Sequence, residues 1–165
     1  MTLQDFNSLS KKEFYENLFR CCGSTHWANE LTEHFPFNSI DELKTTSDKI
    51  WMQCNKKDWL EAFSHHPKIG ERPDKKHEST ATWAGNEQSG MHEANVIVKN
   101  ELAGLNNEYE EKFGYIYIVC ATGKSAEELL SILKNRLTNI ASQEIQVAAM
   151  EQNKITHLRI DKLFT

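Results

Sequence analysis

The sequence predicts an all-α fold of about seven or eight helices, with one buried extended segment at about residues 115–122. Three stretches, Ser10–Glu13, Ser39–Glu42 and Ser125–Glu128, have the serine-to-glutamate spacing of a capping box, which begins a helix. Apolar residues recur with helical spacing after these boxes. The single strand-like run, 114–123, has no partner strand in the sequence. We therefore interpret it as an extended segment between helices, with one edge of a small sheet as the alternative.

Length, charge and cysteine content limit the class of protein. A chain of 165 residues can bury a substantial core, and we expect a single domain spanning residues 1–165. The net charge of -5 argues against a nucleic-acid partner. The four cysteines form no CxxC pair, which favours reduced thiols. There is no apolar run long enough for a membrane span and no leader-like N-terminus, so a cytoplasmic protein with no membrane partner is expected.

Local signals place the helices of the first half of the chain. Each begins at a capping residue or ends at a glycine or proline. We expect one helix to end at Gly23 and a short helix to end at Pro36. Further helices are expected to begin at Ser39 and at Asp48, and a helix from Asn55 is expected to run into His65-His66-Pro67.

The second half is predicted to contain fewer and longer helices. Residues 68–80 have no usable periodicity and are interpreted as a loop. A long helical pattern runs from about Thr82 to Phe113, although its three glycines each weaken the prediction by about 1 kcal/mol relative to alanine. The box at Ser125 opens a stripe of leucines, and the pattern is helical again from about Ser142 to Phe164.

Three ionisable side chains of different kinds are aimed at the predicted core. His66 immediately precedes Pro67, which disfavours helical backbone there and leaves the imidazole at a helix end. Glu87 lies four residues from Trp83, so its carboxylate falls in an apolar stripe if this segment is helical. Arg159 lies on the apolar seam of the last helix. Together these groups indicate an active site.

Each of these groups also has a simpler interpretation. A histidine beside a proline is often structural, a glutamate can lie on an exposed helix face, and an arginine near a helix C-terminus can favour the helix dipole. Metal binding by His65, His66, His77 and His92 is a rival, but neither HExxH nor HxxxH spacing is present. No cysteine has a recognisable histidine partner, and phosphate-binding loops are absent. Because only His66 precedes proline, it is favoured over His65.

At these residues the chain resembles a known family, the 2-oxo-4-hydroxy-4-carboxy-5-ureidoimidazoline (OHCU) decarboxylases. These enzymes form (S)-allantoin in urate and purine catabolism. The matching stretches run in the family's order over nearly the whole chain. They are His66–Glu71 (HPKIGE), Glu87–Gly90 (EQSG), Lys112–Ala121 (KFGYIYIVCA), Asn135–Leu137 (NRL) and Lys154–Arg159 (KITHLR).

The resemblance implies a carboxy-lyase that needs no cofactor and no metal, has a helical fold and is usually a homodimer. It implies that His66, Glu87 and Arg159 are catalytic. His66 would act as base or proton relay beside the substrate's carboxylate and hydroxyl, Arg159 would bind oxygens through its planar fork, and Glu87 would accept N–H groups. The residues implied to line the substrate site are Pro67, Ala84, Gly85, Asn86, Gln88, Ile118, Val119, Cys120, Ala121 and Thr122.

One departure from the family pattern motivates other functions. Many members carry serine three residues before the glutamate, where this chain has Ala84. A helical ligand-binding domain without activity is therefore one alternative, and a metal-dependent hydrolase that uses the histidines is another. Stereospecific formation of (S)-allantoin distinguishes the first from the decarboxylase, and metal analysis distinguishes the second.

Overall fold

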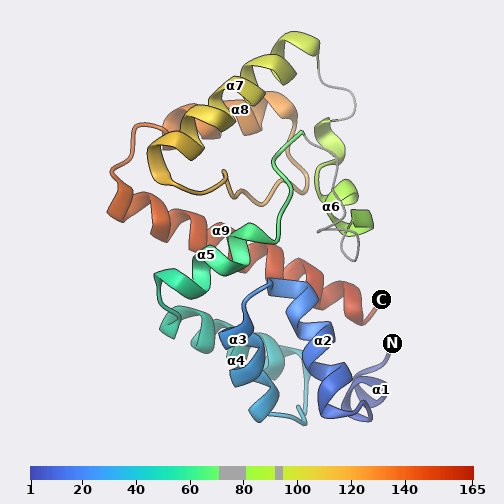
Figure 1. Ribbon diagram of the computed structural model, residues 1–165. Coiled ribbons are helices and arrows are strands. Elements are labelled where there is room, and N and C mark those ends of the chain that lie inside the picture. The colour runs from blue at the N-terminus through green and yellow to red at the C-terminus, as the bar shows by residue number, and fades with distance from the viewer. Residues whose placement is uncertain (71–80, 92–94) are drawn as a thin grey trace. The chain divides into compact units, whose positions relative to one another are not determined.

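The computed structural model describes residues 1–70, 81–91 and 95–165, and these residues form nine α-helices and one 3-10 helix (Figure 1). No strand occurs in these ranges, so the predicted all-α class is confirmed, with nine α-helices rather than seven or eight. The elements are α1 (Leu3–Asn7), α2 (Lys11–Cys22), α3 (Thr25–Glu33), α4 (Ile40–Gln53), α5 (Lys56–Ser64), α6 (Ala81–Glu87), the 3-10 helix η2 (Ser89–Met91), α7 (Val96–Phe113), α8 (Ala126–Arg136) and α9 (Ala141–Leu163).

Two compact units make up the chain that the sequence predicts to be a single domain. Unit 1 comprises Met1–Ala62 and Asn153–Thr165, and unit 2 comprises Phe63–Gln152. The helices α5 and α9 each contribute residues to both units. The three motifs that begin at His66, Glu87 and Lys112 therefore belong to unit 2, whereas Arg159 belongs to unit 1.

The predicted capping signals at Ser10 and Gly23 begin and end a helix in unit 1. The Ser10 hydroxyl accepts the N–H of Glu13 at 3.3 Å, and the Glu13 carboxylate accepts the N–H of Ser10 at 3.0 Å. This reciprocal pair satisfies two backbone donors at the start of α2. At the other end of the helix, Gly23 adopts φ +84°, in the left-handed region that favours glycine.

Asp48 does not begin a helix, contrary to the sequence-based prediction. It lies inside α4, which runs without interruption through the two predicted helices. Its Oδ1 atom instead accepts a hydrogen bond from Asn153 Nδ2 at 2.6 Å and lies 2.7 Å from Nε2 of His157. Asp48 thus joins α4 to α9 within unit 1.

An aromatic cluster fills the core of unit 1. The rings of Phe6, Phe14, Phe35, Phe37 and Phe164 contact one another with centroid separations of 4.6–6.2 Å. Phe6 and Phe14 are fully buried. Because Phe164 comes from the C-terminal end of the chain, this cluster ties that end to the first two helices.

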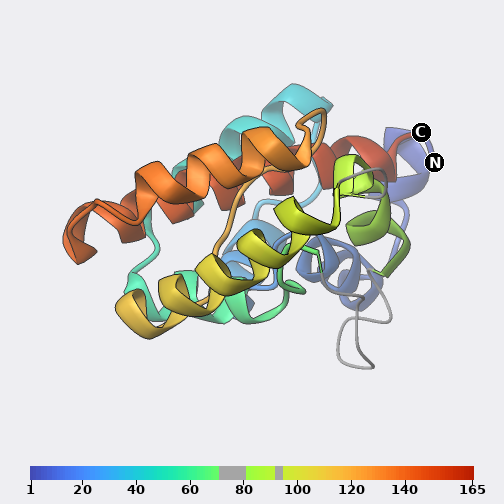
Figure 2. The ribbon, with the colours of Figure 1, turned by 90° about the horizontal axis from the view of Figure 1, so that it is seen from above.

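Unit 2 is built around α7 and α8, which lie side by side in both ribbon views (Figures 1 and 2). Tyr109, on α7, is fully buried and contacts the rings of Phe113, Tyr115 and Tyr117 at centroid separations of 4.7–5.9 Å. Helix α7 ends at Gly114, where φ is +80°. This glycine lets the chain turn back, so that Tyr115 and Tyr117 pack against the helix that precedes them.

The predicted long helix from Thr82 to Phe113 is wrong. The described residues form α6, η2 and α7 instead, and Asn95 caps α7 by accepting the N–H of Ile97 at 2.9 Å. Residues 71–80, most of the predicted loop 68–80, and residues 92–94 lie outside the described ranges.

The predicted extended segment follows Gly114 and is buried. Tyr115 and residues 117–121 are each at most 8 % exposed, and none of them is assigned to a helix or strand. A buried backbone without a strand partner must satisfy its N–H and C=O groups in another way. Side chains from the neighbouring helices do so at Ile118 and Cys120.

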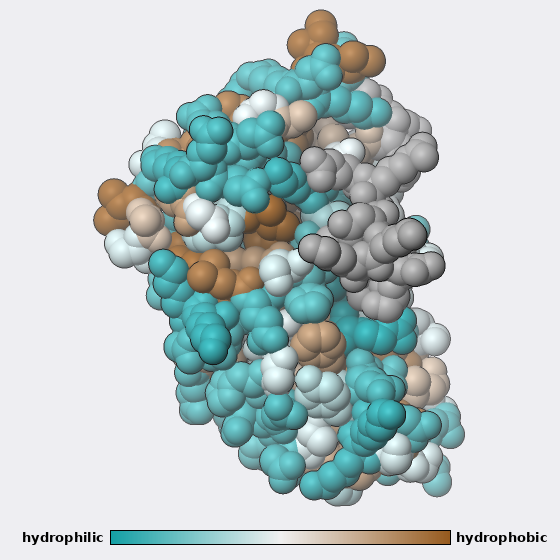
Figure 3. Space-filling view, in the orientation of Figure 1, coloured by the Kyte–Doolittle hydropathy of each residue, from teal (hydrophilic) through white to brown (hydrophobic). Residues whose placement is uncertain are grey.

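Three further features concern the cysteines, the exposed apolar side chains and the apolar character of the helices. All four cysteines are buried, and none of them forms a disulfide. Figure 3 shows hydrophobic residues at the surface where α7 begins, and Val96 and Ile97 there are 68 % and 73 % exposed. Among the described helices, none combines the length and the apolar character that a membrane crossing requires.

Candidate active site

The histidine of the candidate site lies just beyond the end of a helix. Helix α5 ends at Ser64, and the N–H of His66 donates to the carbonyl of Phe63 at 3.2 Å. The His66 side chain is half-buried, and its Nε2 atom is buried. Pro67, which has no N–H and disfavours helix in the residue before it, accounts for the end of α5 at this point.

The stretch that follows His66 is fastened to two other elements of unit 2. The N–H of Gly70 donates to Oε1 of Gln88 at 2.9 Å. The Asn106 side chain, buried on α7, donates from Nδ2 to the carbonyl of Ile69 at 3.2 Å. Gly70 adopts φ +87°, and the Met91 methyl lies 3.3 Å from where a Cβ would be. The histidine-bearing stretch therefore contacts both the segment that carries Gln88 and helix α7.

Helix α6 buries a carboxylate, as the sequence predicts. Glu87 is only 7 % exposed, and Ala84, on the same helix, is 3 % exposed. Gly85 and Gln88 are half-buried, whereas Asn86 is exposed. A buried carboxylate is costly to keep ionised unless it interacts with another group.

A close backbone approach joins η2 to the turn after the extended segment. A Cβ added to Gly90 would lie 2.1 Å from the carbonyl oxygen of Lys124 and 3.4 Å from Cα of Ser125. Only glycine allows the two backbones to come this close. The segment that carries Glu87 and Gln88 is thereby held against the extended segment.

Charged side chains from three parts of unit 2 affect the pKa of the Cys120 thiol. Burial raises the pKa of the Cys120 thiol, and nearby Lys124 lowers it. The carboxylates of Glu151 and Glu87 raise this pKa further. Glu87 is therefore close enough to act electrostatically on the extended segment.

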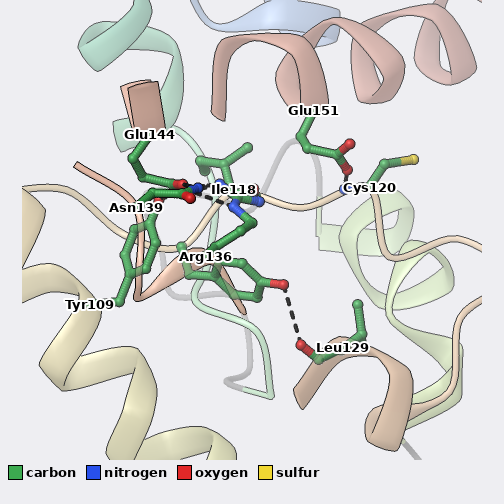
Figure 4. Close-up of polar contacts among 9 residues, drawn as sticks. Tyr109, Ile118, Cys120, Leu129, Arg136, Asn139, Glu144 and Glu151 are labelled. Carbon is green, nitrogen blue, oxygen red and sulfur yellow. Dashed lines mark hydrogen bonds and ion pairs between the residues drawn. The ribbon is translucent and has the colours of Figure 1, made fainter. Parts of the chain in front are cut away.

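Side chains bind the backbone of the extended segment (Figure 4). Arg136 Nη1 donates to the carbonyl of Ile118 at 2.6 Å. Oε2 of Glu151 accepts the N–H of Cys120 at 2.8 Å, and Lys124 Nζ donates to the carbonyl of Cys120 at 2.6 Å. These bonds satisfy peptide groups that a partner strand would otherwise pair.

Arg159 is a buried cation of unit 1. It lies on α9 and is 2 % exposed, between Ile155 and Leu163, which are each 5 % exposed. Its predicted position on the apolar seam of the last helix is thus confirmed. Its catalytic role remains a prediction.

The structure joins three of the stretches that the sequence singled out. Within unit 2, residues 84–91 contact both residues 66–70 and Lys124; His66 lies on the stretch 66–70, and Glu87 lies on the stretch 84–91. Sequence reasoning missed the residues that hold these stretches in place. Arg136 had a detectable signal, since it falls three residues after Leu133 on the apolar stripe of α8.

A group of potential metal ligands occurs elsewhere. Among the described residues, His26, Cys54 and Asp58 place one ligand atom each within 4.8 Å of one another, all in unit 1. Asp58 accepts the N–H of Asn55 at 2.9 Å at the start of α5. This group contains none of the histidines weighed in the sequence analysis, of which His77 and His92 lie outside the described ranges.

Fold and site together define an all-helical protein with ionisable groups buried beside an irregular, side-chain-supported segment. A family model described as OHCU decarboxylase matches residues 7–161. The chain belongs to the OHCU decarboxylase family.

Relatives and solved structures agree with this assignment. The chain is 42 % identical over 147 residues to the Arabidopsis thaliana uric acid degradation bifunctional protein TTL, covering 88 % of this chain and 45 % of that protein. It thus spans about half the length of this relative. It is 26 % identical to the OHCU decarboxylase of Halalkalicoccus jeotgali, with 99 % of this chain and 92 % of that protein covered.

A crystal structure of OHCU decarboxylase in the presence of (S)-allantoin has a TM-score of 0.78 and 38 % sequence identity to this chain, with 90 % of this chain and 97 % of that one covered. A crystal structure of (S)-allantoin synthase has the same fold, with a TM-score of 0.75 at 18 % identity, over 98 % of this chain and 54 % of that one.

Proposed function

We propose that the chain is a carboxy-lyase that decarboxylates OHCU to (S)-allantoin in urate degradation. The observation that carries the proposal is the family match over residues 7–161, together with the contacts that join the family's motifs in unit 2. The solved relative was crystallised in the presence of (S)-allantoin, the expected product.

The reaction requires orientation and proton control more than covalent chemistry. The bond between the ring carbon and the carboxylate breaks, CO2 leaves, and the electron pair remains in the neighbouring π system of the ring. A proton delivered to one face of the carbon that bears the ureido group then sets the S configuration. The protein needs to hold the carboxylate out of the ring plane, stabilise the developing charge and supply that proton.

His66 is the proposed base or proton relay. Its Nε2 atom is buried, which limits exchange of the proton with bulk water. The hydrogen bond from Gly70 to Gln88 holds the following residues, so the imidazole is carried by a stretch with a defined position. Imidazole is the side chain best suited to take and return a proton near neutral pH.

Glu87 and Arg159 are the other two proposed catalytic residues. Glu87 would accept N–H groups of the ureido arm or ring. Arg159 would bind substrate oxygens, since its planar fork suits a carboxylate or carbonyl. Because Oε1 of Gln88 already accepts the Gly70 N–H, we propose that Gln88 contributes mainly by holding the histidine-bearing stretch.

The proposed substrate-binding wall consists of Pro67, residues 84–86 and residues 118–122, which contribute chiefly through backbone groups. Ala84 is buried and has no hydroxyl, so orientation of the ligand would depend on the backbone there. No cofactor or metal is part of the proposal. As the family resemblance implies, we also propose a homodimer, which light scattering after size-exclusion chromatography would test.

The decisive experiment measures the rate and stereochemistry of allantoin formation from freshly generated substrate. Wild-type protein should produce (S)-allantoin faster than the racemic spontaneous background. His66→Asn should lower this rate by at least about a hundredfold, the usual contribution of general acid–base catalysis. His65→Asn is the matched control and should retain activity. A wild-type protein that binds allantoin without accelerating its formation would support the inactive binding domain and overturn the proposal.

A further inference from the structure

Two peptide groups of the extended segment are bound by side chains from different helices. Ile118 offers its carbonyl to Arg136 on α8, and Cys120 offers its N–H to Glu151 on α9. In extended backbone, the polar groups of residues i and i+2 point to one edge, and those of residue i+1 point to the opposite edge. With Ile118 and Cys120 held in this way, extended geometry directs the N–H and C=O of Val119 to the opposite edge.

The contacts of Arg136 restrict the orientations that its guanidinium can adopt. It is 6 % exposed, its Nε donates to Glu144 at 2.7 Å, and its Nη2 donates to Tyr109 Oη at 3.2 Å. Its guanidinium carbon also lies 4.9 Å from the centroid of the Tyr117 ring. Each nitrogen of the guanidinium thus has a partner, and the bond to the Ile118 carbonyl has a fixed direction (Figure 4).

Glu144 completes a fully buried ion pair. It is 0 % exposed, accepts from Arg136 and from the Tyr109 hydroxyl, and takes a third hydrogen bond from Asn139 Nδ2 at 2.7 Å. A buried ion pair contributes little net stability compared with apolar residues of the same volume, because both charges lose their hydration. Stability alone does not explain this pair, whereas the need to orient a backbone carbonyl does.

We propose that Arg136 and Glu151 are positioning residues that orient residues 118–120 for substrate binding. They would direct the N–H and C=O of Val119 toward the cyclic amide and ureido groups of the ligand. The inference rests on the proposed function and on the predicted lining role of 118–122. Neither residue touches the substrate, so the expected effect is on the Michaelis constant and on the handedness of the product.

Glu151 provides the sharpest test because it is half-buried, whereas Arg136 is buried and ion-paired with Glu144. Glu151→Ala removes the acceptor for the Cys120 N–H and should raise KM by about ten- to hundredfold, the range expected for losing one hydrogen bond to a charged group. Glu151→Gln keeps an oxygen acceptor and should recover most of the wild-type KM.

Arg136→Lys tests the other positioning residue. A lysine cannot reproduce the three hydrogen-bonding nitrogens of the guanidinium, so this variant should lower the enantiomeric excess of (S)-allantoin.

A matched control separates positioning from general destabilisation. Glu101→Gln breaks the 2.6 Å ion pair between Glu101 and Lys134, which joins α7 to α8 away from the segment. This variant should keep the wild-type KM and enantiomeric excess. Wild-type KM and product handedness in both Glu151→Ala and folded Arg136→Lys would overturn the positioning role while leaving the decarboxylase intact. An inactive wild-type protein would instead overturn the proposed function on which the inference rests.

Discussion

Replacing Gly90 by alanine should damage the protein more than any other glycine-to-alanine change in α6, η2 or α7. The new Cβ would lie 2.1 Å from the Lys124 carbonyl oxygen and 3.2 Å from its carbonyl carbon. Real Cβ atoms essentially never come closer than about 3.0 Å to a neighbouring heavy atom, so one backbone must move by about 1 Å. Both atoms belong to main chain, and no flexible side chain can absorb the shift.

The expected cost is that of overpacking, about 1–3 kcal/mol of unfolding free energy. With a urea dependence of about 2 kcal/mol per molar, a loss of 2 kcal/mol lowers the unfolding midpoint by about 1 M. Circular dichroism during urea titration measures this shift directly. Because η2 follows Glu87 and Gln88 along the chain, we also expect decarboxylation to slow in this variant.

Gly104→Ala is the matched control for the same chemical change. Gly104 lies inside α7, and an added Cβ there would meet no heavy atom within 4 Å. Alanine in a helix interior should stabilise by about 0.5–1 kcal/mol relative to glycine. If Gly90→Ala unfolds within 0.3 M urea of wild type and keeps full activity, the close approach of η2 to Lys124 is not present in solution.

Three further perturbations test the burial of individual groups. Glu87→Gln keeps the shape of a buried side chain but removes its charge, so turnover should fall by about tenfold or more while the thermal midpoint stays or rises; an unchanged turnover would argue against a catalytic carboxylate. Burial raises the pKa of the Cys22 and Cys54 thiols to about 12, so a thiol reagent at pH 8 should label them, as judged by mass spectrometry, only after unfolding. Burial also raises the pKa of Tyr109 and Tyr117 above the unfolded value of about 10, so the unfolded chain releases these protons first and stability should decline as pH rises past 10. Phenolate absorbance should then appear together with the loss of helical circular dichroism, and phenolate formation by all four tyrosines in a still-folded protein would contradict the burial.

Local chemistry explains the parts of the fold that could be predicted from the sequence. The Ser10 and Ser125 capping boxes and the glycine stop at Gly23 depend on groups within a few residues of one another. The same holds for the end of α5 before Pro67. These signals therefore placed helix boundaries without knowledge of the rest of the chain.

Contacts between distant residues explain the two wrong predictions. Asp48 resembled a helix start, but in the fold it contacts His157, 109 residues away. The periodic pattern from Thr82 to Phe113 resembled one helix, but Gly90 packs against Lys124, and the chain forms three elements there instead. Both outcomes depend on partners that periodicity within a short window does not detect.

The amino-acid sequence by itself determined the helical class, the family and the burial of Glu87 and Arg159, because apolar spacing and motif order are properties of the linear chain. Only the tertiary structure decided that Arg136, Glu144 and Glu151 support the extended segment. A backbone without a partner strand needs donors and acceptors from wherever the fold brings them, and these side chains become neighbours of residues 118–120 only after α8 and α9 have packed.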